Sequence, residues 1–97
     1  MDLRQVVFHY PGPAWNDGVG FREQPGVRDH IAHYAEFLES GKLLLGGPFL
    51  DDSGGMMIAV DSVTREELET FAASDPAVTS GLLTFKIKSW IVAMHGR

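Results

Sequence analysis

The chain has no cysteine among its 97 residues. This absence excludes a disulfide framework, thiolate catalysis, and zinc or iron–sulfur sites built on cysteine, and it favours a reducing compartment. We therefore expect a cytoplasmic protein. Positive charge is also scarce, because eight Lys and Arg stand against thirteen Asp and Glu, for a net charge of -5 without any basic run. The charge that drives binding to phosphate backbones is missing, so we expect no nucleic-acid partner.

Long hydrophobic runs are absent as well. No stretch approaches the roughly 20 apolar residues that a membrane-spanning helix needs, and the first ten residues lack the basic segment of an export signal. We expect neither a membrane association nor an export signal. The composition, with 44% hydrophobic and 22% charged residues, is that of an ordinary globular protein. The length suits one domain, which we place at residues 1–97.

The hydrophobic pattern predicts four strands and two helices. The predicted strands cover residues 3–10, 42–45, 56–60 and 82–92, and the predicted helices cover residues 26–40 and 64–74. Ser62 and Thr64 offer oxygens for the start of the second helix, and Thr64 to Glu67 has the spacing of a capping box. Residues 11–25 are rich in Gly and Pro, which predicts a long irregular loop. The order βαββαβ predicts an α+β, ferredoxin-like fold, an antiparallel sheet with two helices on one face.

Val and Leu occur at both odd and even positions of the first and last predicted strands. Both faces of the sheet are therefore expected to be apolar. The two helices cover only one of these faces. A second copy of the chain is the simplest cover for the other face. We therefore predict a homodimer that packs through its sheets.

His30 and Asp75 are the candidate catalytic residues. His30 lies at the shoulder of the apolar stripe of the first helix, so it should be half-buried, whereas His33 lies further round on the polar side and should be exposed. That stripe consists of Val27, Ile31, Tyr34 and Leu38. Asp75 opens an Asp-Pro step just after the second helix. If the fold brings them together at a pocket, an imidazole and a carboxylate are suited to moving protons near neutral pH.

Each of these two residues also has a purely structural interpretation. Histidines on amphipathic helices are often boundary residues, and Asp-Pro is a common helix exit in which the carboxylate bonds to nearby amides. As further walls of the pocket we expect His9, Trp15 and Phe49 to contact a small-molecule ligand. The glycines at 46–47 and 54–55 are more typical of turns than of a phosphate cradle, because neither pair precedes a predicted helix.

Four histidines raise the question of a metal site. His30 and His33 are three residues apart on one helix, and His9 or His95 could join them. No HExxH motif, facial-triad spacing or cysteine accompanies them, so we expect no metal and no cofactor.

An ordered set of motifs resembles the YCII-related (YciI-like) family. The set comprises His30, Gly41-Lys42-Leu43-Leu44, Gly46-Gly47-Pro48-Phe49, Asp75-Pro76 and Gly81. The resemblance spans nearly the whole chain and implies a ferredoxin-like subunit of the dimeric α+β barrel type. It also implies that the histidine and aspartate of the family's active-site pair fall on His30 and Asp75. Some related proteins are small lyases or dehydrochlorinases that act on ring-cleavage products.

Together these observations predict a cofactor-free acid/base enzyme, an isomerase or a dehydrochlorinase-like lyase. Its substrate would be a small organic acid or a ring-cleavage product. His30 would exchange the proton and Asp75 would orient the ring. The alternative is a non-catalytic homodimer that binds a small ligand or has a structural role.

Overall fold

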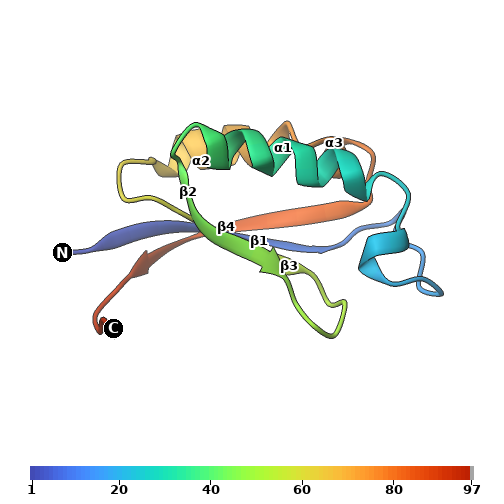
Figure 1. Cartoon of the computed structure of the whole chain (residues 1–97), viewed down its shortest axis with the longest axis horizontal. Helices are drawn as coiled ribbons and strands as arrows, with labels where there is room; N and C mark the ends of the chain where they lie inside the picture. The colour runs from blue at the N-terminus through green and yellow to red at the C-terminus, as the bar shows by residue number, and fades with distance from the viewer. Residues whose placement is uncertain (97) are drawn as a thin grey trace.

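The computed structural model of the protein describes residues 1–96. Its elements are, in order, β1 (Leu3–Pro11), the 3-10 helix η1 (Phe21–Glu23), α1 (Val27–Glu39), β2 (Leu43–Pro48), β3 (Gly55–Ala59), α2 (Arg65–Ala73), α3 (Pro76–Thr79) and β4 (Leu83–Ile91). The sheet has the order β2-β3-β1-β4, and all neighbouring strands are antiparallel. Figure 1 shows the three helices on one face of this sheet. The predicted α+β, ferredoxin-like architecture is confirmed, with α3 as an additional helix of one turn.

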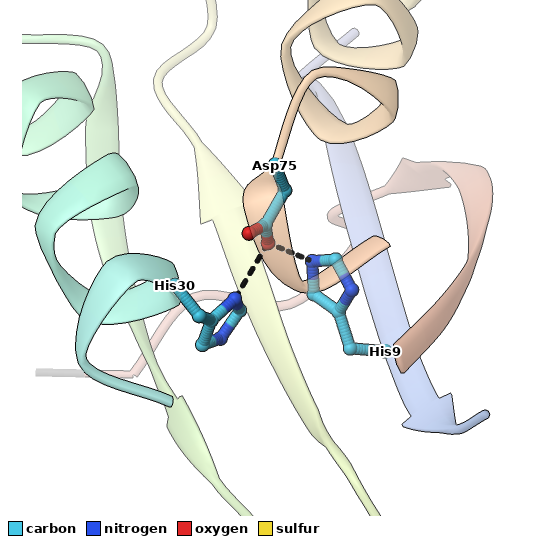
Figure 2. A group of neighbouring side chains, drawn as sticks. All are labelled: His9, His30 and Asp75. Atoms are coloured by element: carbon cyan, nitrogen blue, oxygen red, sulfur yellow. Dashed lines mark hydrogen bonds and ion pairs between the residues drawn. The ribbon is translucent and has the colours of Figure 1, made fainter. Parts of the chain in front are cut away.

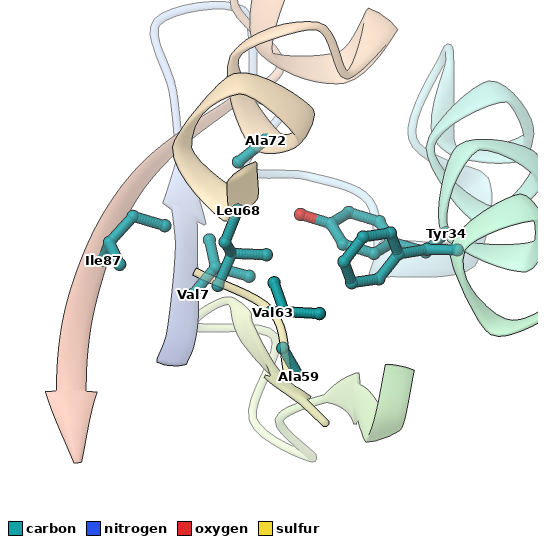
Figure 3. Packing of buried hydrophobic residues seen from close by; sticks show 8 residues of the cluster. Val7, Tyr34, Ala59, Val63, Leu68, Ala72 and Ile87 are labelled. Atoms are coloured by element: carbon teal, nitrogen blue, oxygen red, sulfur yellow. The ribbon is translucent and has the colours of Figure 1, made fainter. Parts of the chain in front are cut away.

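The main core lies between the sheet and helices α1 and α2 (Figure 3). Alternate residues of β1 and β4 point towards the helices, as the period of two in a strand requires. Val7 and Ile87 are directly paired across these strands and both belong to the core. The other buried members are Tyr34, Phe37, Ala59, Val63, Leu68 and Ala72.

Helix α2 begins where the capping pattern predicts. Thr64 is its N-cap, and its Oγ1 accepts a hydrogen bond from the backbone N–H of Glu67 at 3.1 Å. Ser62, the other candidate, lies two residues before this cap. The Glu67 carboxylate in turn accepts a hydrogen bond from Lys42 at 2.5 Å, which ties α2 to the start of β2. These contacts fix the N-terminal end of α2, the helix whose other end leads to Asp75.

The buried face of α1 differs from the predicted stripe. Val27, His30, Tyr34 and Phe37 are buried, whereas Ile31 and Leu38 are 54% and 57% exposed. The expectation that Ile31 and Leu38 belong to the core is therefore wrong. The helix is rotated so that its His30 edge faces the sheet, and the two displaced apolar side chains border a pocket instead.

The loop between β1 and α1 is ordered by a buried side chain. The Gln24 amide donates to the carbonyl oxygens of Asn16 and Val19 at 2.7 and 2.8 Å and accepts from the Asn16 N–H at 2.9 Å. The loop also contains η1, the one turn of regular structure that its Gly and Pro content did not predict. These contacts hold Phe21 beside His30, where their ring centroids are 6.2 Å apart.

The face of the sheet opposite the helices carries apolar side chains over three of its strands. Two rows of cross-strand neighbours run from β2 through β3 and β1 to β4, namely Leu45, Ile58, Val6 and Lys88, and Gly47, Met56, Phe8 and Lys86. The lysines therefore border this face on β4, as their alternation predicts, and Lys88 lies 5.7 Å from the ring of Phe8. We call the face of the sheet opposite the helices the open sheet face.

No helix within residues 1–96 is long and apolar enough to span a bilayer.

Candidate functional site

His9, His30 and Asp75 meet between the sheet and the helices, at the end of the molecule where α1 begins (Figure 2). His9 comes from β1, His30 from the first turn of α1, and Asp75 from the junction of α2 and α3. The structure thus brings the two predicted catalytic residues together across 45 positions of the sequence. All three are buried, with exposures of 2% for His9, 4% for His30 and 0% for Asp75.

Asp75 is positioned by the end of one helix and the start of the next. It is the N-cap of α3, and its Oδ1 accepts the backbone N–H of Ala77 at 2.9 Å. Pro76 occupies the first turn, where its fixed φ suits a helix and its missing N–H leaves no donor unpaired. The structural interpretation of Asp-Pro is therefore correct for Oδ1. The other carboxylate oxygen, Oδ2, remains available to the histidines.

His30 donates from Nδ1 to Oδ2 of Asp75 at 2.5 Å. Because the carboxylate accepts this bond, the proton lies on Nδ1 and the ring orientation is fixed. Nε2 of His30 has no hydrogen-bond partner within residues 1–96. Every fully buried side-chain nitrogen or oxygen in these residues does have a partner. Nε2 is therefore not fully buried, and it is the accessible nitrogen of the ring. It is the atom of the pair that a bound molecule can reach.

His9 is held by two hydrogen bonds that do not involve Asp75. Its Nδ1 lies 3.3 Å from the carbonyl oxygen of Thr84, which can only accept, so Nδ1 carries the proton. Nε2 then accepts the hydroxyl proton of Tyr34 at 2.7 Å. The 4.0 Å from His9 Nε2 to Asp75 Oδ2 is too long for a hydrogen bond. Tyr34 thereby keeps His9 from competing with His30 for the carboxylate.

The protonation states of His9 and Tyr34 follow from burial. The pKa of His9 is lowered from 6.5 to about 4, mainly by desolvation and also by the neighbouring His30, whose effect is larger than the opposing effect of Asp75. Desolvation also raises the pKa of Tyr34, and the charge of Asp75 adds to this effect. At neutral pH, His9 is therefore neutral and Tyr34 keeps its proton. These states are the ones that the His9–Tyr34 hydrogen bond requires.

A cavity of about 270 Å³ opens beside His30, between α1 and strands β2 and β3. His9, His30 and Tyr34 are its polar side chains. The remaining walls are apolar side chains and glycine backbone, namely Phe21, Ile31, Ala35, Leu38, Leu43, Gly46, Gly47, Pro48, Gly54, Gly55, Met57 and Leu83. The site combines a fixed imidazole with an apolar hollow, which is typical of a small-molecule binding site.

The same three residues offer a set of atoms for a metal ion. One ligand atom from each of His9, His30 and Asp75 lies within 4.8 Å of the others. The metal ligands considered from the sequence were His30 and His33 together with His9 or His95. Neither His33 nor His95 belongs to this cluster. An ion here would have to displace the His30–Asp75 bond and the His9–Tyr34 bond. Each of these groups is already satisfied by the protein, which makes this arrangement a hydrogen-bonded network.

The other two predicted ligand contacts lie outside this cavity. Trp15 is half-buried against the small cluster formed by Ala77, Leu82 and Leu83, behind the Asp75 turn. Phe49 lines a separate surface hollow beside Phe21. His9 does line the cavity. Of the three predicted walls, only His9 is thus in place to contact a ligand directly.

The remaining two histidines are also apart from the network. His33, expected to be exposed, is half-buried because its ring stacks on Phe71 at 3.9 Å between centroids and its Nε2 bonds to the Phe71 carbonyl oxygen at 2.7 Å. His95 lies near Asp2, with 61% of its side chain exposed. Neither residue lines the cavity.

A sequence model of the YCII-related domain matches residues 5–91. The chain belongs to the YCII-related family. The match includes His9, His30, Tyr34 and Asp75, and all four strands apart from the first two residues of β1. Among curated proteins, no significant relative of the chain is found.

A solved structure similar to this YCII-related chain is 5-chloro-2-hydroxyhydroquinone dehydrochlorinase (TftG) from Burkholderia phenoliruptrix AC1100, in complex with 2,5-dihydroxybenzoquinone. The two share 19% sequence identity, with a TM-score of 0.60, and the similarity covers 96% of this chain and 95% of the other. The common fold therefore extends over the whole domain.

Two functional features of this YCII-related domain escaped the sequence analysis. Tyr34 was assigned to the core, although it lies one helical turn after His30 on the same face. His9 was expected only as a wall, although it shares the inward alternation of Val7. Both signals could place these residues near His30. Neither could reveal that they bond to one another, because that contact joins a strand to a helix 25 positions away.

Proposed function

We propose that the protein is a cofactor-free acid/base enzyme, an isomerase or a lyase of the dehydrochlorinase type, acting on a small organic molecule. The observation that carries this proposal is the His30 ring, which is bonded to Asp75 through Nδ1 and accessible at an apolar cavity through Nε2. An imidazole held in this way can take up a proton at one nitrogen while a carboxylate stabilises the resulting charge at the other.

In the proposed reaction, Nε2 of His30 removes a proton from a carbon next to a carbonyl group. The electron pair of that C–H bond moves into the enolate. In an isomerase, His30 returns the proton to another carbon of the same molecule. In a lyase, the electron pair instead expels a leaving group such as chloride, and the proton passes to solvent. Asp75 keeps its own position throughout, because Ala77 and His30 hold its two oxygens.

The similarity to a dehydrochlorinase supports the reaction class, since elimination of chloride needs the same proton removal. The ring-cleavage products and organic acids expected from the sequence contain acidic C–H bonds of the required kind.

The proposal can be tested before any natural substrate is identified. We expect the protein to catalyse exchange of solvent deuterium into carbons next to the carbonyl group of small cyclic ketones, measured by loss of proton NMR signals. His30→Ala should lower the exchange rate by roughly 100-fold or more, the usual contribution of a general base. Asp75→Asn should lower it by a similar factor, because the amide can present its N–H₂ to the ring and favour the wrong tautomer.

His95→Ala is the matched control, because it removes an exposed histidine outside the cavity. Its exchange rate should equal that of the unaltered protein. Exchange that survives in His30→Ala would contradict the proposed role. If ligands bind and no exchange exceeds the rate in buffer, the protein is a ligand-binding dimer, in which the satisfied His30–Asp75 bond serves only the fold.

We further propose that the functional unit is a homodimer joined through the open sheet face. No helix of the described part of this chain covers the apolar rows over β1, β2 and β3, and Leu45 on the β2 edge is 59% exposed, although Val6 and Ile58 are buried at 3% and 8%. A domain of this size buries a smaller share of its surface on folding than a large domain does, so the area buried against a second copy would add to its stability. The cytoplasmic location favoured by the lack of cysteine stays a prediction.

A further inference from the structure

The cavity beside His30 has no charged side chain that could pair with an anion. Its lining contains neither Lys nor Arg, and neither Asp nor Glu. The nearest acidic group is Asp75, which lies behind His30 with no exposed surface. Any positive charge on His30 is opposed at 2.5 Å by that carboxylate. The electrostatic environment of the cavity is thus neutral or negative.

The polar groups that a ligand can reach are also few. Nε2 of His9 already accepts the hydroxyl proton of Tyr34. Nδ1 of His9 is directed to Thr84. Nε2 of His30 is therefore the one ring nitrogen of His9 and His30 without a partner, while the Tyr34 oxygen, which donates its proton to His9, can still accept a hydrogen bond. Nε2 of His30 lies among carbon-rich walls. A ligand can satisfy it with a single polar group.

Glycine backbone brings two strands close to this space. A side-chain carbon at Gly46 would collide with the sulfur of Met57, and one at Gly54, which has φ +135°, would collide with the carbonyl oxygen of His9. Position 54 therefore needs glycine for the strands to pack as they do, whereas a side chain at Gly46 would require the Met57 side chain to shift. The resulting wall has no side chain beyond the apolar ones already named, so it offers a ligand no side-chain hydrogen-bonding group.

We infer, on the basis of the function proposed above, that the substrate is an uncharged, mostly apolar small molecule that meets His30 through one polar group, and that the cavity discriminates against carboxylates. A carboxylate would lose its hydration against carbon walls, gain no cationic partner, and be repelled by Asp75. A neutral amide, ketone or enol of the same size loses far less hydration. Among the substrates expected from the sequence, this favours neutral ring compounds over small organic acids.

The inference is tested with pairs of probes that have the same shape and differ in charge. We would titrate the protein with benzamide and benzoate, and with cyclohexanecarboxamide and cyclohexanecarboxylate, at pH 7.5. Binding would be followed by NMR chemical shifts of the Met57 and Leu43 methyl groups, which line the cavity. At least one amide should bind about tenfold or more tightly than its carboxylate, because the carboxylate leaves an unpaired charge against the walls. Equal or tighter binding of both carboxylates, or binding of no amide at these methyl groups, would overturn the inference.

A variant with a new positive charge tests the physical cause. Leu38→Arg places a cation on the exposed rim of the cavity, and Ala32→Arg places the same charge on an exposed part of α1 outside it. Leu38→Arg should tighten benzoate binding roughly three- to fivefold relative to benzamide, as a partly exposed ion pair would. Ala32→Arg should leave this ratio unchanged. Equal changes in both variants would show that net charge rather than the cavity selects the ligand, and would contradict the inference.

These binding experiments separate the inference from the proposed function. Amides that bind without deuterium exchange on any ketone would disprove the enzyme and leave the charge selectivity intact. Exchange on carbonyl compounds that carry a carboxylate, without exchange on their neutral amides, would support the enzyme and overturn the inference.

Discussion

Tyr34 sets the hydrogen-bonding pattern of the site, because its hydroxyl occupies the nitrogen of His9 that is nearest to Asp75. We expect Tyr34→Phe to lower the free energy of unfolding by about 1–3 kcal/mol, since a buried acceptor is left without a donor. The His9 proton should then move from Nδ1 to Nε2, which can donate it to Oδ2 of Asp75. Urea unfolding measures the first effect, and nitrogen-15 NMR of the histidine rings measures the second.

Tyr10→Phe is the matched control for this prediction. Tyr10 is 36% exposed, so loss of its hydroxyl should change the unfolding free energy by less than about 0.5 kcal/mol. If Tyr34→Phe were as stable as Tyr10→Phe, with an unchanged His9 spectrum, the Tyr34 hydroxyl would have no role in holding His9.

His9 makes stability depend on pH. Its pKa is about 4 in the folded protein, against the ordinary value of 6.5 for a histidine in an unfolded chain. Between these values the unfolded state binds the extra proton, so stability is fully present above pH 6.5 and falls as the pH drops towards 4. The difference corresponds to a loss of roughly 3 kcal/mol. Urea unfolding at pH 7 and pH 4 measures it.

His9→Gln provides the comparison, because Gln cannot titrate in this range. The loss of stability between pH 7 and pH 4 should be smaller in this variant than in the unaltered protein by up to roughly 3 kcal/mol. Contributions of other groups are common to both proteins and cancel. An identical loss in the two proteins would mean that His9 accepts its proton without cost to the fold.

At the scale of secondary structure, the start of α2 depends on a single side chain. Thr64→Ala should lower the unfolding free energy by about 1 kcal/mol, because the Glu67 N–H loses the Thr64 oxygen. Ser62→Ala, two residues earlier on the exposed surface, should change it by less than about 0.5 kcal/mol. Thermal unfolding of both variants checks the prediction. A larger loss of stability in Ser62→Ala than in Thr64→Ala would show that Ser62, and not Thr64, caps the helix.

The elements show which parts of the fold local sequence determines. Alternating strands, a capping box and glycine-rich turns are local signals, and they predicted four strands, two helices and their order. The α3 turn escaped because Asp75-Pro76 is equally suited to ending one helix and beginning another. Its N-cap role becomes visible only with the Ala77 N–H in place.

The rotation of α1 shows the limit of such reasoning. An apolar stripe predicts which side of a helix is buried, but Ile31 and Leu38 lie at a cavity, and His30 is buried in their place. The buried position of His30 depends on Asp75, 45 positions away. The sequence could suggest the His–Asp pair because both residues depart from their local patterns. It could not identify Tyr34 as the residue that orients His9, because Tyr34 fits the apolar stripe.

At the scale of the whole molecule, the open sheet face predicts self-association. Leu45 is 59% exposed on the β2 edge of this face, and Leu38 is 57% exposed on α1 in the helical layer. Leu45→Lys should weaken the dimer, because it places a charge in an apolar contact, whereas Leu38→Lys should not. Light scattering over a range of concentrations measures the mass of each variant. A monomeric unaltered protein, or a dimer lost only in Leu38→Lys, would contradict association through this face.

A crystal structure with the tightest-binding neutral probe would show which atom of the site contacts the ligand. We predict that the polar atom of the probe lies roughly 2.7–3.2 Å from Nε2 of His30, in the cavity between α1 and β2, with Nδ1 still bonded to Asp75. A probe bound elsewhere, or a His30 ring turned so that Nε2 contacts Asp75, would contradict the account.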